Sequence, residues 1–262
     1  NPIFLTRPSS DLSVLLPGAE VRAGTLDNPS ALEVADVDTL IYCASMGFGH
    51  IPALLAHIEK TSPIRRAVFI STTAIFTTLH AASRGPRQAA EAAVEASALD
   101  WTILRPTMIY GTARDRNISR LLGFLRRWPI FPLCGNALWQ PIHVEDLADA
   151  VISALDEPHT IHHAYNLAGA EALPFSELVR TAASAVNRQV LLVPVPLQAA
   201  LIAARLTGIV RQEQVRRLAE DKAFSFAEAA RDFGFAPRTF AAGVALEARL
   251  LGLAGDRRAQ RS

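Results

Sequence analysis

The sequence predicts an α/β fold in which helices cover a parallel β-sheet. Short runs that are apolar on both faces, at Thr39–Cys43, Arg66–Ser71 and Trp101–Leu104, predict buried strands. Helical stretches of about a dozen residues separate these runs. Half of the 262 residues are hydrophobic, which is enough for a substantial core. Strands buried on both faces and joined by crossover helices are typical of a parallel sheet.

Two further strands and three helices complete the first part of the chain. The strands are expected at Ile3–Thr6 and Glu20–Ala23. The helices are expected at Asn28–Ala35, where a proline lies near the first helical position, at Pro52–Glu59 and at the Ala- and Glu-rich stretch Arg87–Ser97.

The alternation of strands and helices loosens after Pro106. Residues 131–142 are rich in Pro, Gly and Trp and read as irregular, and 255–262 reads as a flexible tail. The apolar stretch 193–210 reads as a buried helix, because prolines and Arg205 leave it short of the ~20 apolar residues that span a bilayer. The remaining expected elements are helices at Ile118–Trp128, Val144–Leu155, Phe175–Val186, Arg211–Glu220 and Phe240–Leu251, and strands at His163–Leu167 and Val190–Val193.

Composition narrows the function classes. The formal net charge of +1 gives no electrostatic case for a nucleic-acid partner. Two cysteines are too few for a disulfide framework, so a reduced, cytoplasmic setting is expected. Twenty-four arginines against two lysines indicate a GC-rich bacterial genome. The sequence has no signal-peptide pattern, and because it starts at Asn1 we expect further chain upstream.

Four groups of motifs occur in a fixed order along the chain. The first is a strand that ends in hydroxyl groups, the second a helix and strand followed by Arg-Pro and Tyr-Gly, and the third a helix that opens with a histidine. The fourth is a Tyr-Asn-Leu-Ala-Gly strand end, with an Asp-Phe-Gly stretch later in the chain. These groups occupy Val68–Phe76, Ala89–Gly111, Gln140–Val151, and Tyr165–Gly169 with Asp232–Phe240.

In this order the motifs resemble the extended and atypical short-chain dehydrogenase/reductases, the NAD(P)-dependent epimerase/dehydratase-like proteins. The branch that resembles the complex I accessory-subunit and NmrA-like proteins is the most similar. The resemblance implies a Rossmann-type doubly wound parallel sheet, here with its first strand missing, and a small, mostly helical C-terminal substrate lobe. It places the dinucleotide-binding domain at 1–112 with parts of 140–170, and the substrate lobe at 113–139 and 170–254.

The resemblance also implies where the cofactor binds. In an open parallel sheet, ligands lie beyond the carboxyl ends of the strands. The residues expected there are Arg7, Leu26, Asp27, Cys43, Ala44, Ser45, Ser71, Arg105 and Pro106. The Gly-rich phosphate turn of the family is expected upstream of Ile3. A similar stretch, Gly47-Phe48-Gly49, has Pro52 where a third glycine belongs and lies after a later strand of the family.

Arg7 favours NADP(H) over NAD(H). NAD-preferring relatives carry an acidic residue at the end of the second family strand. Here that strand ends in Leu5-Thr6-Arg7, and a guanidinium group is suited to a 2′-phosphate. The alternative is an ordinary solvated arginine in a loop.

The catalytic residues of the family are only partly present. The family uses a Ser or Thr at a strand end, to which Thr73 and its neighbour Thr72 correspond, with strand-end capping as the alternative. It also uses a Tyr with a Lys four residues later; those positions carry Ser83 and Arg87. A serine hydroxyl is too weak an acid to replace a phenol, although Arg87 could still bind a ribose. The ordinary Tyr/Lys mechanism is therefore absent.

The substrate side offers further candidates, each with a structural alternative. Tyr110 could replace the missing acid or pack in the core, and His143 could contact the substrate at the start of its helix. Arg114 and the arginines after it could bind a diphosphate or line a solvated helix face. Arg105 could equally be a buried structural arginine. His162 and His163 should point to opposite faces of a strand, so no shared metal site is expected.

Two functions remain open at this stage, and a third reading, a fold that binds no nucleotide, applies only if the native gene starts near Asn1. One is an NAD(P)-dependent oxidoreductase or epimerase-like enzyme that acts on a nucleotide-sugar or another carbonyl or hydroxyl substrate. The alternative is a non-catalytic NADP(H)-binding redox sensor or assembly subunit, which the lost Tyr/Lys pair favours. The resemblance also suggests a homodimer that pairs through helices flanking the sheet, including Arg87–Ser97.

Overall fold

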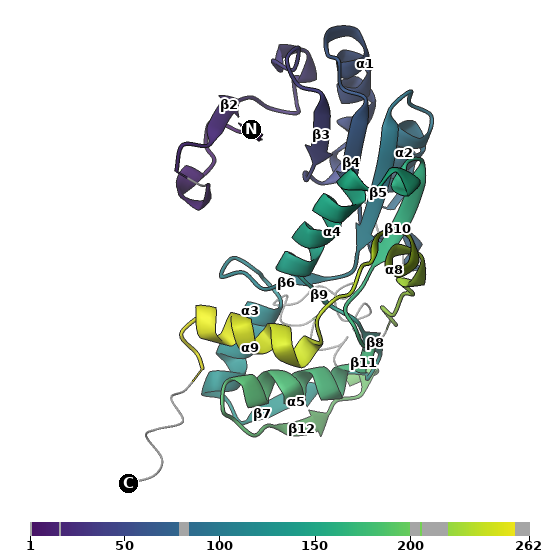
Figure 1. Cartoon of the computed structure of the whole chain (residues 1–262). Helices are drawn as coiled ribbons and strands as arrows, with labels where there is room; N and C mark the ends of the chain where they lie inside the picture. The colour runs from purple at the N-terminus through teal and green to yellow at the C-terminus, as the bar shows by residue number, and fades with distance from the viewer. Residues whose placement is uncertain (1, 16, 79–83, 200–204, 206–219, 255–262) are drawn as a thin grey trace. The chain divides into compact units, whose positions relative to one another are not determined.

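The computed structural model describes residues 2–15, 17–78, 84–199, 205 and 220–254. The chain divides into two compact units (Figure 1). Unit 1 comprises Asn1–Leu104 and Pro158–Ala164, and unit 2 comprises Arg105–Glu157 and Tyr165–Ser262. The sequence prediction placed 1–112 with parts of 140–170 in the first domain; unit 1 does include 158–164, whereas 105–112 lie in unit 2. The difference arises because the chain passes from unit 1 to unit 2 inside the strand β5 (Asp100–Pro106).

A four-stranded sheet is the centre of unit 1. Its strand order is β10-β5-β4-β3, and β3, β4 and β5 run parallel. The register pairs Thr39 with Arg66 and Arg66 with Asp100. This parallel sheet confirms the predicted fold class. Its strands are β3 (Thr39–Tyr42), β4 (Arg66–Ile70), β5 (Asp100–Pro106) and β10 (His163–Leu167).

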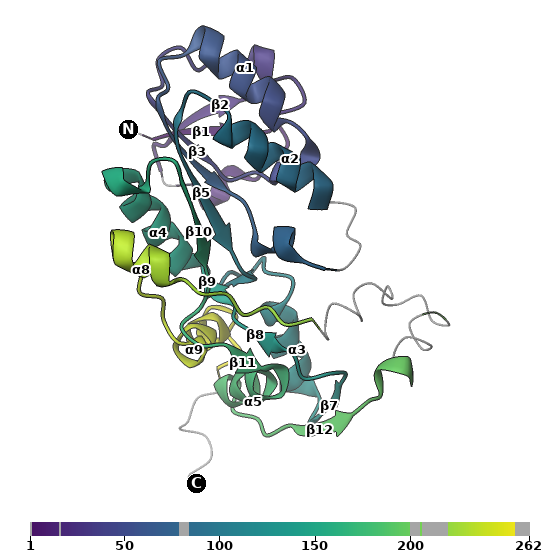
Figure 2. The same cartoon turned by 90° about the vertical axis from the view of Figure 1, so that its right-hand side faces the viewer.

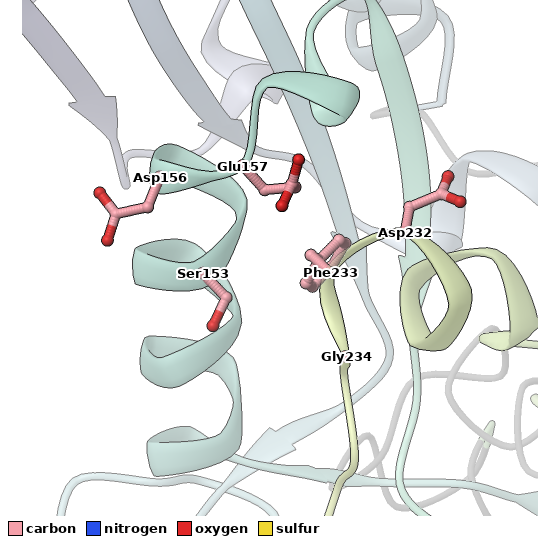
Figure 3. A pocket seen from close by; sticks show the side chains of 6 residues that line it. All are labelled: Ser153, Asp156, Glu157, Asp232, Phe233 and Gly234. Atoms are coloured by element: carbon pink, nitrogen blue, oxygen red, sulfur yellow. The ribbon is translucent and has the colours of Figure 1, made fainter.

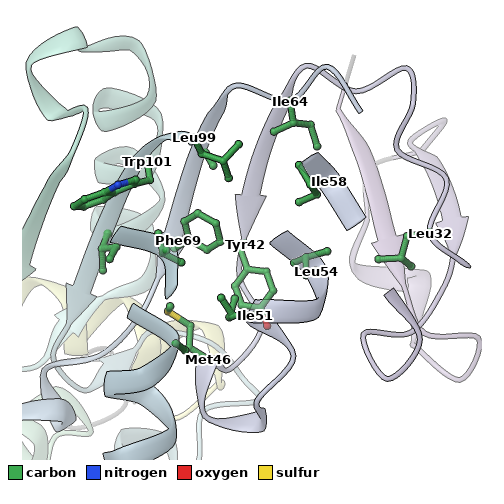
Figure 4. Close-up of a cluster of buried hydrophobic side chains, with 14 residues drawn as sticks. Leu32, Tyr42, Met46, Ile51, Leu54, Ile58, Ile64, Phe69, Leu99 and Trp101 are labelled. Carbon is green, nitrogen blue, oxygen red and sulfur yellow. The ribbon is translucent and has the colours of Figure 1, made fainter. Parts of the chain in front are cut away.

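Two helices cover one face of this sheet. Helix α1 (Ile51–Thr61) and helix α2 (Arg84–Glu95) contribute apolar side chains three to four residues apart, the spacing of one helix face. Alternate residues of β4 and β5 meet them, because successive side chains of a strand point to opposite faces. Figure 4 shows the resulting core. Its larger members are Leu32, Tyr42, Met46, Ile51, Leu54, Ile58, Ile64, Phe69, Leu99, Trp101 and Ile103.

Strands β1 (Ile3–Thr6) and β2 (Glu20–Ala23) form a separate parallel pair in unit 1, with Ile3 opposite Glu20. In the doubly wound order 3-2-1-4-5-6, the second and third strands pair with each other and the fourth to sixth pair in turn. The neighbours in the described sheets follow that order.

Unit 2 is built around three helices, α3 (Ile118–Arg127), α5 (Phe175–Ala185) and α9 (Phe240–Leu250), which pack on one another (Figure 2). A second core of apolar side chains joins them. Helices α4 (Val144–Asp156) and α8 (Ala227–Phe233) also belong to this unit. Its short strands are β6 (Ile109–Tyr110), β7 (Ile130–Leu133), β8 (Leu138–Trp139), β9 (Ile142–His143), β11 (Leu173–Pro174) and β12 (Leu191–Pro194).

Three local predictions were wrong. The helix expected at Asn28–Ala35 is a single 3-10 turn, Pro29–Ala31, because the Leu32 carbonyl bonds the His57 ring (2.9 Å) instead of continuing a helix. The stretch 131–142, predicted to be irregular, contains most of β7, all of β8 and the first residue of β9. His162 lies in a turn with a φ of 61°, one residue before β10, and not in a strand.

Several predictions fall largely or wholly outside the described residues. They are the buried helix at 193–210, the helix at Arg211–Glu220 and the tail at 255–262. The other expected helices and strands are present within a few residues of their predicted ends. Helix α8 was not predicted.

Candidate functional site

The end of β4 brings together hydroxyl groups and a buried carboxyl group in unit 1. The Ser71 amide donates to the Leu104 carbonyl (2.7 Å), and the Ser71 hydroxyl donates to a carboxylate oxygen of Glu91. Glu91 lies on α2 and is buried. Strand β4 and helix α2 are thus linked by a side-chain hydrogen bond at the carboxyl end of the sheet.

Thr72 and Thr73 follow directly. The Thr72 hydroxyl accepts the Ala74 amide (3.2 Å) and caps a 3-10 turn at Thr73–Phe76, so Thr72 does cap the strand end. Thr73 is buried within that turn. Both residues stand at the strand end, which is where the sequence places the catalytic hydroxyl.

The end of β3 leads into a second such turn. Cys43 and Ala44 follow the strand, and the Ser45 hydroxyl accepts the Gly47 amide (3.3 Å) to cap the turn Met46–Phe48. Gly49 then has a φ of 79°, the left-handed conformation that glycine adopts readily, and α1 begins at Ile51.

Arg87 reaches this turn from α2. A Cβ atom placed on Gly47 would lie 3.4 Å from the Arg87 Nε and 3.5 Å from its Cγ, so the arginine side chain runs along the bare backbone of Gly47. A guanidinium group held against open backbone at a strand end could donate to ribose hydroxyls or to phosphate oxygens. These residues therefore fit the dinucleotide that the sequence predicts.

The β1–β2 pair holds the remaining cofactor candidates of unit 1. Arg7 follows β1 and is exposed, and its carbonyl accepts the Ser10 amide (2.9 Å). Leu26 packs against the first core. Asp27 is exposed, and its carboxylate accepts the Thr25 hydroxyl (3.0 Å). Arg7 and Asp27 thus offer charged groups, whereas the Leu26 side chain serves packing.

Sequence reasoning missed an ion-pair network beside these residues. Arg22 on β2 donates to Asp36 (2.6 Å) and to Glu20 (3.0 Å). The hydrogen bond from Arg22 lowers the pKa of Asp36 to about 2. The paired charges hold the loop that follows β2.

Unit 2 contains the candidates on the substrate side. Arg105 is half-buried and Pro106 buried at the end of β5. Tyr110 and His143 are register partners in the parallel pair of β6 and β9, and their rings meet edge to face at 5.3 Å. Arg114 is exposed in the loop before α3. Ser83 lies outside the described residues.

Tyr110 is enclosed. Only 1% of its surface is exposed, and it packs against His143 and Phe240. Burial raises the pKa of its phenol above the usual value. Core packing, the alternative left open from the sequence, therefore describes this side chain better than acid catalysis.

His143 caps a helix. Its Nδ1 accepts the Glu145 amide (3.3 Å) at the start of α4, and burial lowers the pKa of its ring. A hydrogen-bond acceptor in this position stabilises the helix start. The contact with substrate that the sequence suggests stays a prediction.

Helix α9 of unit 2 carries a buried carboxyl group, Glu247, which the sequence analysis did not predict. It is 1% exposed, and neither carboxyl oxygen has a hydrogen-bond partner among the described residues. Burial, together with the charge of Asp115, raises the pKa of Glu247 to about 8. Its spacing of three from Val244 and seven from Phe240 places it on the buried face of the helix, a signal visible in the sequence.

Two of the sequence motifs meet through Arg238. Its Nε donates to the buried carboxylate of Asp146 (2.7 Å) and its Nη1 to Glu145 (2.6 Å). The Arg238 amide also donates to Asp146 (3.0 Å). The Asp-Phe-Gly stretch is thereby fixed to the start of α4.

A cavity of about 500 Å³ opens in unit 2 between the ends of α4 and α8 (Figure 3). It contains none of the predicted site residues. Its acidic side chains would repel the phosphates of a dinucleotide. The cavity is lined by Ser153, Asp156, Glu157, Asp232, Phe233 and Gly234.

Within the described residues, no group of three or more His, Cys, Asp or Glu side chains could hold a metal ion. The same residues include no helix that is long and apolar enough to cross a membrane.

Comparison with known proteins gives a family match. Residues 49–168 match the model of the NAD dependent epimerase/dehydratase family. The matched segment contains the ends of β4 and β5, Thr72, Thr73, Arg87, Tyr110 and His143.

Two curated relatives are subunit 9 of the NADH dehydrogenase [ubiquinone] 1 alpha subcomplex, a mitochondrial protein. The Arabidopsis thaliana protein is 29% identical over 133 residues, 49% of this chain. The Dictyostelium discoideum protein is 32% identical over 79 residues, 30% of this chain. The matches span 33% and 22% of those two proteins, respectively.

Solved structures share the fold. The protein gox2253 superposes with a TM-score of 0.73 at 20% identity, covering 96% of this chain and 90% of its own. RMD from Pseudomonas aeruginosa, complexed with NADPH, superposes with a TM-score of 0.70 at 13% identity, covering 96% of this chain and 98% of its own. UDP-glucuronic acid 4-epimerase from Bacillus cereus, in complex with NAD, superposes with a TM-score of 0.69 at 12% identity, covering 90% of this chain and 82% of its own. The predicted Rossmann-type fold is confirmed.

Proposed function

Because residues 49–168 match the model of the NAD dependent epimerase/dehydratase family, we propose that this protein binds a nicotinamide dinucleotide at the carboxyl ends of the unit 1 strands. It then acts as an oxidoreductase or epimerase-like protein on a nucleotide-sugar or another carbonyl or hydroxyl substrate. The placement of Arg87 along the bare backbone of Gly47 is the observation that carries this proposal.

The residues that would bind the cofactor are Arg87, Ser45 and the Ser71–Thr73 segment. The dinucleotide would supply the hydride-transfer chemistry. From its position beside Gly47, Arg87 would donate to the ribose or phosphate. Thr73 binds the reacting oxygen of the substrate.

NADP(H) is the proposed cofactor. Arg7 is exposed after β1, at the position where NAD-preferring relatives carry an acidic residue. Solved structures of this fold hold either NAD or NADPH. The preference therefore rests on Arg7 alone.

A second candidate function is that of a non-catalytic, NADP(H)-binding assembly subunit. The absent Tyr/Lys pair and the enclosure of Tyr110 favour it. The curated relatives, which are NADH dehydrogenase subunits by name, agree with this alternative.

We also propose a cellular setting and an oligomeric state for this protein. The free thiols of Cys43 and Cys134 suit the reduced, cytoplasmic setting expected of a bacterial protein. A homodimer would pair through helices flanking the sheet, including α2.

Turnover by the complete protein separates the two functions. NADPH-dependent turnover is measured over a panel of nucleotide-sugars, aldehydes and ketones, with Thr73→Ala and Thr73→Ser as variants. For an enzyme we expect Thr73→Ala to lower kcat by on the order of a hundredfold, and Thr73→Ser to restore most of it because the hydroxyl is kept. Unchanged turnover in Thr73→Ala contradicts the role of Thr73. NADPH binding with no turnover on any substrate leaves the assembly-subunit function.

A further inference from the structure

The two-stranded sheet of β7 and β12 in unit 2 has an exposed apolar face. The strands are parallel, and Leu191 lies opposite Ile130 and Val193 opposite Pro132. Ile130 is 52% exposed, Leu191 63% and Val193 41%. These three side chains and Pro132, which is also exposed, form what we term the outer face.

The opposite face of the same pair is covered. Phe131, Leu133 and Leu192 pack against the second core. The Phe131 ring meets Phe175 of α5 and Phe124 of α3 at centroid distances of 6.1 and 5.7 Å. The sheet is therefore packed on unit 2 through one face, and the outer face points away from the second core.

The sequence of these strands is that of a sheet buried on both sides. The sequence of β7 is Ile-Phe-Pro-Leu and that of β12 is Leu-Leu-Val-Pro. Neither strand alternates apolar with polar residues, as a strand with one solvent-exposed face does. A contiguous exposed apolar patch on such a sheet marks an interaction site. Something apolar is expected to cover the outer face.

Basic and aromatic residues gather at one end of the outer face. Because the strands are parallel, their starts lie side by side, and the Leu191 amide donates to the Pro129 carbonyl (2.7 Å). Arg126, Arg127 and Trp128 are followed by Pro129 and then β7, and Arg188 lies three residues before the start of β12. All four are exposed, Trp128 by 60%.

The surrounding sequence contains no opposing charge. There is no Asp or Glu at 116–144 or at 178–212, stretches that include α3, β7 and β12. The arginines at this end are therefore not neutralised by acidic neighbours in sequence, and the outer face presents an apolar surface with a positive rim.

We propose that the outer face binds the surface of an anionic lipid bilayer. Such a surface is apolar below a layer of negative charge, and it matches both parts of the patch. Ile130, Leu191 and Val193 would enter the acyl boundary, Trp128 would lie at the headgroup level, and the arginines would contact lipid phosphates. In this proposal the protein contacts the bilayer surface through the outer face.

Vesicle flotation of the complete protein tests this proposal. The probes are vesicles of phosphatidylcholine alone and of phosphatidylcholine with phosphatidylglycerol in equal parts. We expect binding to the anionic vesicles only, weakened by salt, with a blue shift of tryptophan fluorescence that Trp128→Phe removes. Arg126→Gln with Arg127→Gln should weaken binding at least tenfold, and Leu191→Ser with Val193→Ser by a similar factor.

Ile152→Ser is the matched control, because Ile152 is an exposed apolar residue (58%) on α4 of the same unit. It should bind vesicles as the unchanged protein does. Three outcomes overturn the proposal: no binding to anionic vesicles, equal binding by the Leu191/Val193 variant, or light scattering that shows a dimer which this variant dissociates. The last outcome would assign the outer face to a second copy of the chain.

Discussion

The buried carboxyl group of Glu247 sets a pH dependence at the scale of a single residue. Its pKa is raised from 4.5 to about 8, mainly by burial. Between these values the folded state keeps the proton that the unfolded state loses. Stability from this group is therefore fully present below the unfolded pKa and is lost as the pH rises through the folded pKa.

Glu247→Gln removes this dependence. As the pH rises between the two pKa values, we expect the free energy of unfolding of the variant to increase relative to that of the unchanged protein. The relative increase is up to about 1.4 kcal/mol per pH unit. Urea unfolding at a series of pH values from about 5 to about 8 measures it. Glu177→Gln, at an exposed position on α5, is the control and should show no such gain. Parallel stability curves for Glu247→Gln and the unchanged protein would show that Glu247 ionises normally in the fold.

The candidate site was only partly predictable at this scale. The Thr72–Thr73 strand end and the Arg87 position follow from motif spacing, and the structure puts Arg87 beside Gly47. The enclosure of Tyr110 depends on contacts with α9, more than a hundred residues away, which no local pattern reveals. Glu247 could have been found from the helical spacing of α9.

At the scale of elements, the approach of α9 to β6 and β9 depends on one glycine. A Cβ on Gly243 would collide with the Tyr110 hydroxyl and come within 2.9 Å of its Cζ. Tyr110 is buried and packs against the rings of His143 and Phe240. Glycine at 243 therefore allows the helix to pack directly over the Tyr110–His143 pair.

Gly243→Ala should destabilise the protein by about 1–3 kcal/mol through overpacking, despite the better helix propensity of alanine. Gly123→Ala on α3 is the matched control, since no atom lies within 4 Å of its added Cβ, and it should stabilise by about 0.5–1 kcal/mol. Urea unfolding of both variants gives the difference. Equal stability of the two variants would mean that α9 does not press on Tyr110.

Strands with apolar residues on both faces were the most predictable elements. β3, β4 and β5 begin and end within two residues of their expected bounds. The expected helix at Asn28–Ala35 failed because a distant histidine, His57, takes the Leu32 carbonyl. The two-residue strands β8, β9 and β11 are too short to carry a periodicity, and only tertiary pairing defines them.

At the scale of the whole molecule, the candidate residues are distributed over the two units. Unit 1 carries the strand ends with Thr72, Thr73 and Arg87, and unit 2 carries the enclosed Tyr110 and the outer face of β7 and β12. The family match covers parts of both. Dinucleotide binding by unit 1 is the central claim, and both proposed functions depend on it.

Titration calorimetry of the complete protein with NADPH and with NADH tests that claim most directly. We expect saturable, micromolar binding of NADPH, weaker binding of NADH, and a loss of roughly tenfold or more in NADPH affinity for Arg87→Ala. Gln88→Ala, at an exposed neighbour on α2, is the control and should bind as the unchanged protein does. No saturable binding of either dinucleotide would contradict the account.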